Sequence, residues 1–131
     1  MDPKTYVKGV LRNESRDFDI IRPRLDGETI RLLHAAMGLV TEAGEFLDAL
    51  KKHIFYGKPL DKTNLVEELG DTFWYIGVAS DVLGISFEEI MQINHNKLFT
   101  RYSKGFSAEE ANNRDLDAER DVLENKDKND T

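Results

Sequence analysis

The sequence of 131 residues contains no cysteine, and this absence excludes disulfides, thiolate zinc sites and cysteine nucleophiles. It also lacks any apolar run of about 18 residues, the length needed to cross a membrane. Residues 1–6 carry charge and no apolar segment follows them, so neither a signal peptide nor a transmembrane helix is predicted. A cytoplasmic location is therefore expected, and oxygen and nitrogen atoms remain as metal ligands.

Positive charge is scarce, because 18 lysines and arginines face 25 aspartates and glutamates, which gives a net charge of -7. This excess of acid argues against nucleic acid or an anionic membrane as a partner. A small anionic ligand remains possible, since metal ions and a few well-placed cationic side chains can offset the local acid.

The alternating pattern of half-buried strands is absent, and the helical spacing of apolar residues predicts an all-α protein. A loop is expected through Pro23, and a short helical piece begins at Ser107. Gly84 is expected to end one helix, and Ser86 with Glu89 forms a capping box for the next. The main predicted helices cover residues 3–13, 27–56, 63–83 and 87–101.

One domain is expected over residues 1–123, followed by an acidic tail, residues 124–131, that is predicted to be disordered. From residue 115 onward charged residues dominate, and few apolar side chains are available as anchors. The second to fourth helices are expected to form an antiparallel bundle. Three helices would leave apolar residues such as Phe73 uncovered, so a homodimer or homotetramer is predicted to complete the bundle.

Two pairs of acids carry the strongest functional signal. Glu42-x-x-Glu45 lies in the second predicted helix and Glu68-x-x-Asp71 in the third, with 22 residues between the pairs. Residues three apart share one face of a helix, so each pair directs its carboxylates the same way. Antiparallel packing would bring all four together, where their mutual repulsion favours a bound cation. Mg²⁺, with Mn²⁺ as a substitute, is the predicted cofactor because both prefer oxygen ligands.

The neighbours of these acids favour a cleft. Ala35, Gly38 and Ala49 share the stripe of the first pair, and apolar residues continue the stripe of the second. No histidine follows a glutamate at the spacing of a di-iron site, and the three histidines are too scattered for a zinc site. A metal-free carboxylate pair of the glycosidase kind would need a sugar groove, which such a short helical chain does not suggest.

Three motifs surround the acids: residues 38–45 read GLVTEAGE, residues 67–75 read EELGDTFWY, and residues 94–102 read NHNKLFTRY. They resemble the motifs of the MazG-like, all-α nucleoside triphosphate pyrophosphohydrolases, and the resemblance extends from about residue 32 to residue 123. Two positions depart from the family pattern. Thr41 stands where many members have a further acid, and Ser103 stands where a proline is common.

The resemblance implies Mg²⁺-dependent hydrolysis of nucleoside or deoxynucleoside triphosphates to the monophosphate and pyrophosphate, by a homodimer or homotetramer. The catalytic residues and metal ligands that it implies are Glu42, Glu45, Glu68 and Asp71. The residues expected to bind the substrate are Asn94, Lys97, Arg101, His34, Tyr75 and Arg114. Trp74 is expected in the core, and Lys52 and Lys58 are expected to be solvated surface residues.

Two other functions remain open from the sequence. A phosphoribosyl-ATP pyrophosphohydrolase shares the same acids but acts on a different substrate. A catalytically silent helical module would bind a nucleotide or a partner protein and use the metal only for its structure.

Overall fold

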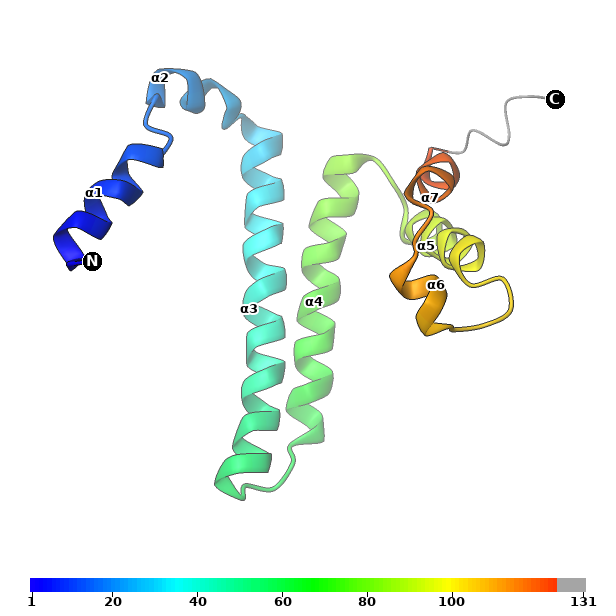
Figure 1. The fold of residues 1–131 in the computed structure, drawn as a ribbon. Coiled ribbons are helices and arrows are strands. Elements are labelled where there is room, and N and C mark those ends of the chain that lie inside the picture. The colour runs from blue at the N-terminus through cyan, green and yellow to red at the C-terminus, as the bar shows by residue number, and fades with distance from the viewer. Residues whose placement is uncertain (125–131) are drawn as a thin grey trace.

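The computed structural model describes residues 1–124, so the predicted tail lies outside the described residues except for its first position. Its elements, shown in Figure 1, are α1 (Pro3–Asn13), α2 (Phe18–Ile21), the 3-10 helix η1 (Arg22–Arg24), α3 (Gly27–Tyr56), α4 (Lys62–Leu83), α5 (Phe87–Arg101), α6 (Ala108–Asn112) and α7 (Leu116–Leu123). Within residues 1–124 there is no β-strand, only an isolated bridge between Ser103 and Gly105. The prediction of an all-α protein is confirmed.

Helices α3 and α5 have the predicted bounds, and α4 begins one residue before its predicted start. The side chains of Asp26 and Asp61 accept hydrogen bonds from backbone N–H groups in the first turns of α3 and α4. Gly57 and Gly84 end these helices with φ angles of 66° and 63°, a left-handed conformation that favours glycine. Ser86 opens α5 with the predicted capping box. Local sequence therefore sets the lengths of these helices.

Helices α3 and α4 form an antiparallel hairpin, as Figure 1 shows. Ala35 is 1% exposed, and Gly38 is also buried. A Cβ atom on Gly38 would lie 2.2 Å from the Tyr75 ring, so only glycine at this position leaves room for the ring. Arg31 of α3 and Asp81 of α4 form an exposed ion pair further along the hairpin. The two helices thus meet through small residues.

Two regions differ from expectation. The segment around Pro23, expected as a loop, contains α2 and η1, and proline suits the first turn of such a helix because its φ is already fixed. The charged segment after residue 115, for which no helix was predicted, forms α7 with Asp115 as its cap. Of the three long helices predicted to pack together, α3 and α4 form an antiparallel pair. The third, α5, packs with α7. Short helices held by tertiary contacts leave only a weak local signal.

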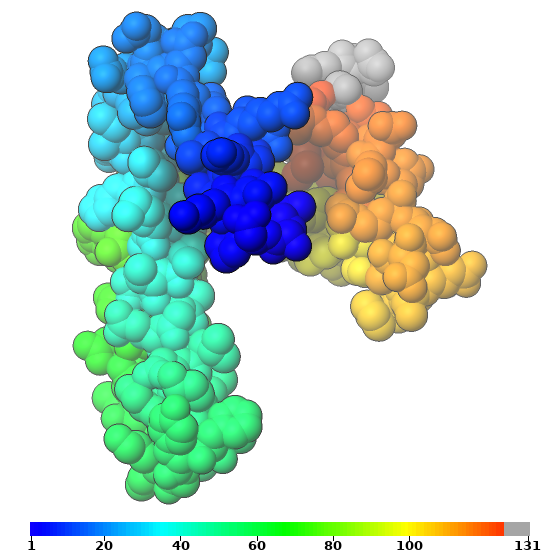
Figure 2. Space-filling model, turned by 60° about the vertical axis from the view of Figure 1, so that its left-hand side comes forward, coloured from blue at the N-terminus to red at the C-terminus, as the bar shows by residue number. Residues whose placement is uncertain are grey.

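The single chain has very little core. Ala35 is the one buried apolar side chain within residues 1–124, and Phe73 is 61% exposed, in line with the prediction that three helices leave apolar faces uncovered. Figure 2 shows that the C-terminal helices stand away from the lower half of the hairpin. None of the helices in the described part is long and apolar enough to span a membrane.

Candidate active site

The hairpin places two stripes of side chains opposite one another. Along α3 the stripe contains Glu42, Glu45, Ala49 and Lys52. On the other side it starts at Asp61, the N-cap of α4, and continues along α4 with Asn64, Glu68, Asp71 and Tyr75. Members of each stripe are three or four residues apart, so they share a helix face. Because the helices are antiparallel, the combined surface has aromatic residues at one end, acids in the middle and cationic residues near the turn.

Three of the four predicted acids converge. Carboxylate oxygens of Glu42, Glu68 and Asp71 all lie within 4.8 Å of one another, one acid coming from α3 and two from α4. Glu42 is half-buried, Glu68 is buried and Asp71 is exposed. Glu45, the fourth acid, is exposed and lies one turn further along α3. Such a set of oxygen donors suits a hard divalent cation.

The charge of this cluster is not balanced by the protein. Burial and then the neighbouring carboxylate of Glu45 raise the pKa of Glu42 above its ordinary value, and Asp71 and Glu68 add to this. Within residues 1–124, no lysine, arginine or histidine forms an ion pair with any of these acids. Thr41 opposes the rise, because its hydroxyl donates a hydrogen bond of 3.3 Å to Glu42. A cation bound among the acids would relieve their repulsion.

Asn64 is a further polar residue of the site, one that the acid pairs did not predict. Its side-chain Nδ2 donates a 2.6 Å hydrogen bond to Oε1 of Glu68, and this amide fixes the orientation of the buried carboxylate. The spacing of four residues between Asn64 and Glu68 was the available signal, because such pairs lie side by side on a helix.

An aromatic pocket adjoins the acids on the side away from the turn. It is lined by Glu42, Asp71, Trp74 and Tyr75 and has a volume of about 390 Å³. His34 meets the rings of Trp74 and Tyr75 edge-on, at centroid distances of 6.3 and 5.7 Å. Trp74 was expected in the core, but it is 58% exposed because no other element of the described chain covers this face. Of the predicted substrate residues, Tyr75 lines this pocket and His34 contacts its two rings.

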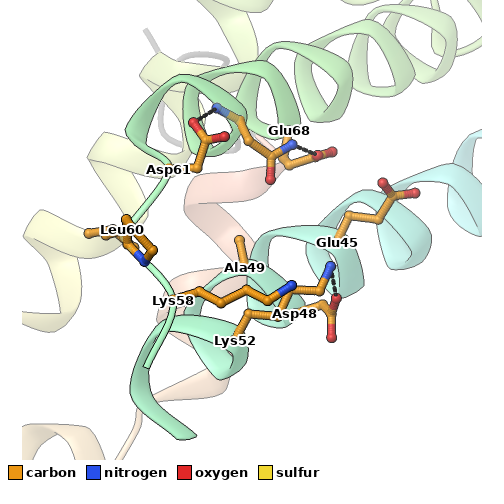
Figure 3. Close-up of a pocket in the computed structure, with 10 residues that line it drawn as sticks. Glu45, Asp48, Ala49, Lys52, Lys58, Leu60, Asp61 and Glu68 are labelled. Carbon is orange, nitrogen blue, oxygen red and sulfur yellow. Dashed lines mark hydrogen bonds and ion pairs between the residues drawn. The ribbon is translucent and has the colours of Figure 1, made fainter. Parts of the chain in front are cut away.

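A second pocket, the turn pocket, adjoins the acids at the opposite end. It has a volume of about 690 Å³, and Figure 3 shows its lining. Glu45 and Glu68 border it on the acidic side, and Lys52 and Lys58 border it near the turn. The two lysines are exposed, as expected, and they line the same pocket as Glu45 and Glu68.

The remaining predicted substrate residues lie in the C-terminal helices. Arg101 of α5 and Arg114 of the α6–α7 connection both donate hydrogen bonds to Glu119 of α7, with shortest distances of 2.6 and 2.7 Å. These partners hold the pKa of Glu119 well below its ordinary range, Arg101 contributing most. Asn94 is exposed and Lys97 half-buried on α5. In this single chain the two arginines thus bind a carboxylate of the protein itself. Glu119, which supplies this carboxylate, was not predicted from the sequence.

A protein family matches the part of the chain that carries the acids. The family model described as the MazG nucleotide pyrophosphohydrolase domain matches residues 32–106, which include both acid pairs and the predicted third motif. The chain belongs to this family.

Two curated relatives are similar to parts of the chain. Gene 37 protein of Mycobacterium phage L5 is 32% identical over 87 residues, covering 63% of this chain and 76% of the relative. The uncharacterized protein YvdC of Bacillus subtilis (strain 168) is 32% identical over 73 residues, covering 49% of this chain and 69% of the relative. No solved structure matches the chain. Neither relative's name states a substrate.

Proposed function

We propose that the protein hydrolyses nucleoside or deoxynucleoside triphosphates to the monophosphate and pyrophosphate in the presence of Mg²⁺. The observation that carries this proposal is the convergence of three carboxylates within 4.8 Å in a chain of the MazG family. The reaction adds one water across the bond between the α- and β-phosphoryl groups. The site must therefore bind the highly charged triphosphate next to divalent metal ions that offset its charge.

Glu42, Glu68 and Asp71 are the proposed direct metal ligands, with Glu45 as a fourth ligand, direct or through water. Bound Mg²⁺ would neutralise phosphate charge and favour attack by water on phosphorus. Asn64 holds the carboxylate of Glu68 in place through its 2.6 Å hydrogen bond. Mn²⁺ would serve as a substitute because it accepts the same oxygen donors.

The aromatic pocket is the proposed position of the nucleoside. Tyr75 and Trp74 offer ring faces and edges to a base, and His34 contacts both of these rings. Asn94, Lys97, Arg101 and Arg114 remain proposed phosphate or sugar contacts. Their position on the C-terminal helices requires association of chains or movement of α5 to bring them to the acids.

A homodimer or homotetramer is part of the proposal. The apolar side chains left uncovered on the hairpin, among them Phe73 and Val40 at 61% and 74% exposure, are larger and more numerous than a stable monomer of this size would leave in water. Association of two chains through these faces would supply the core that one chain lacks. Light scattering on the purified protein measures this directly.

The decisive experiment is a release assay for pyrophosphate. The purified protein is incubated with a panel of ribonucleoside and deoxyribonucleoside triphosphates and with phosphoribosyl-ATP, in Mg²⁺, Mn²⁺ or a chelator. We expect release from at least one nucleoside triphosphate, dependent on the metal. Turnover of phosphoribosyl-ATP alone would favour the phosphoribosyl-ATP pyrophosphohydrolase, and no release from the whole panel would favour the silent binding module.

A further inference from the structure

The turn pocket lies on the opposite side of the acids from the aromatic pocket, and the two differ in chemistry. Glu45 and Glu68 line the turn pocket, while Glu42 and Asp71 line the aromatic one. A ligand that reaches both pockets therefore passes the acidic cluster at its middle. A nucleoside triphosphate has this polarity, with an aromatic base at one end and the most negative phosphates at the other.

Lys52 supplies the first cation of the turn pocket. It follows Glu45 by seven residues, or two helical turns, so its Cα lies about 10 Å from that of Glu45 on the same face. Its amino group is 2.6 Å from a carboxylate oxygen of Asp48, which also pairs with Lys51. Asp48 thus holds the Lys52 side chain against α3 beside the pocket.

Lys58 supplies the second cation, and its backbone is fixed. The Lys58 N–H donates a 3.2 Å hydrogen bond to the carbonyl of Lys52, and the Lys58 carbonyl accepts a 2.8 Å hydrogen bond from Nδ1 of His53. Within residues 1–124 the Lys58 ammonium forms no ion pair. Figure 3 shows that the side chains of Lys52 and Lys58 extend toward the same space near Glu45.

We propose that the turn pocket binds the β- and γ-phosphates of the substrate, and hence the pyrophosphate product, through Lys58 and Lys52. This inference rests on the proposed function and assigns the direction in which the substrate lies along the hairpin. Two ammonium groups beside a carboxylate cluster recognise phosphate as point charges, and the flexible lysine stem lets each follow the leaving group. The aromatic pocket then receives the nucleoside.

The test is calorimetric titration of the full-length protein, in Mg²⁺, with inorganic pyrophosphate and separately with AMP, GMP, CMP, UMP and dTMP. We expect Lys58→Met to weaken pyrophosphate binding about tenfold, the effect of one lost charge-assisted contact, and to change monophosphate binding less than about twofold. Lys58→Arg keeps the charge and should retain most of the affinity. Lys51→Met is the matched control, since Lys51 shares the Asp48 partner but does not line the pocket.

The inference is overturned if the wild-type protein does not bind pyrophosphate, or if Lys58→Met and Lys51→Met bind it as the wild type does. It is also overturned if Lys58→Met weakens monophosphate binding by the same factor, because the nucleoside would then occupy the turn pocket. These outcomes are separable from failure of the proposed function, which is read from turnover. If the protein hydrolyses triphosphates but the Lys58 variants bind pyrophosphate as the wild type does, the proposed function stands and only the assignment of the turn pocket is wrong.

Discussion

The hairpin and the C-terminal helices each bury a glutamate, and the two glutamates have different side-chain partners. Glu119 is 4% exposed and receives hydrogen bonds from Arg101 and Arg114. Glu68 is equally buried at 4% exposure, but its side-chain partner is the neutral amide of Asn64. The first glutamate is enclosed by opposite charge, and the second is surrounded by other acids.

This difference separates a structural acid from a candidate ligand-binding acid. A buried carboxylate between two guanidinium groups has its charge compensated within the protein. The cluster around Glu42 lacks such compensation, and the pKa of Glu42 is raised while that of Glu119 is lowered. Burial alone therefore does not identify a functional acid, because the partners decide whether a ligand is needed.

The comparison is tested most strongly by Glu68→Gln, which keeps the size of the side chain but removes its charge. We expect kcat/KM for the best triphosphate to fall by at least about a hundredfold, because a metal ligand is lost. Calorimetry should show weaker Mg²⁺ binding as well. Glu67→Gln, at the exposed neighbouring position, is the control and should remain near wild type. Wild-type activity of both variants would exclude Glu68 from the site.

Gly38→Ala tests the close contact that positions Tyr75 beside the acids. The added Cβ would lie 2.2 Å from the ring, so we expect a loss of about 1–3 kcal/mol in the free energy of unfolding, measured with denaturant. Gly44→Ala is the matched control on the same helix, where no atom lies within 4 Å of the new Cβ. It should gain up to about 1 kcal/mol from helix propensity. Destabilisation at Gly44 would reveal a partner chain packed there.

Glu119→Gln tests the compensated acid. We expect the midpoint of thermal unfolding at neutral pH to fall by several degrees while the acidic cluster keeps its Mg²⁺ affinity. The folded pKa of Glu119 lies below its ordinary value of 4.5, so its stabilisation is present above about pH 4.5 and is lost as the pH falls toward the folded pKa. The variant should lack this part of the acid-induced loss of stability. Unchanged pH dependence would contradict the role of the ion pairs. Glu109→Gln, at an exposed site on α6, serves as control.

The smallest effect is expected for Arg31→Ala, which removes an ion pair between α3 and α4. Both side chains are more than half exposed, at 52% for Arg31 and 67% for Asp81, so solvent screens their attraction. We expect a change of about 0.5 kcal/mol in the free energy of unfolding, reduced further by salt. A loss of several kcal/mol would mean that the pair is buried in an assembled form.

Much of the fold was predictable because its signals are local. The ends of α3, α4 and α5 depend on caps at Asp26, Asp61 and Ser86 and on left-handed glycines, all of which act within a few residues. Helix α7 was not predicted because its anchor, Glu119, is stabilised by Arg101, 18 positions away in the sequence. The exposure of Trp74 was missed for the same reason, since helical spacing shows which residues share a face but not whether another element covers it.

By itself, the sequence determined the long helices, the two acid pairs and the family motifs, because helix periodicity and capping are properties of neighbouring residues. Only the tertiary structure decided that Glu42, Glu68 and Asp71 converge while Glu45 faces the turn pocket. It also decided that Lys58 lines the same pocket as Glu45 and Glu68. Such placements depend on how two helices pack across a small-residue contact, and that packing joins residues far apart in the chain.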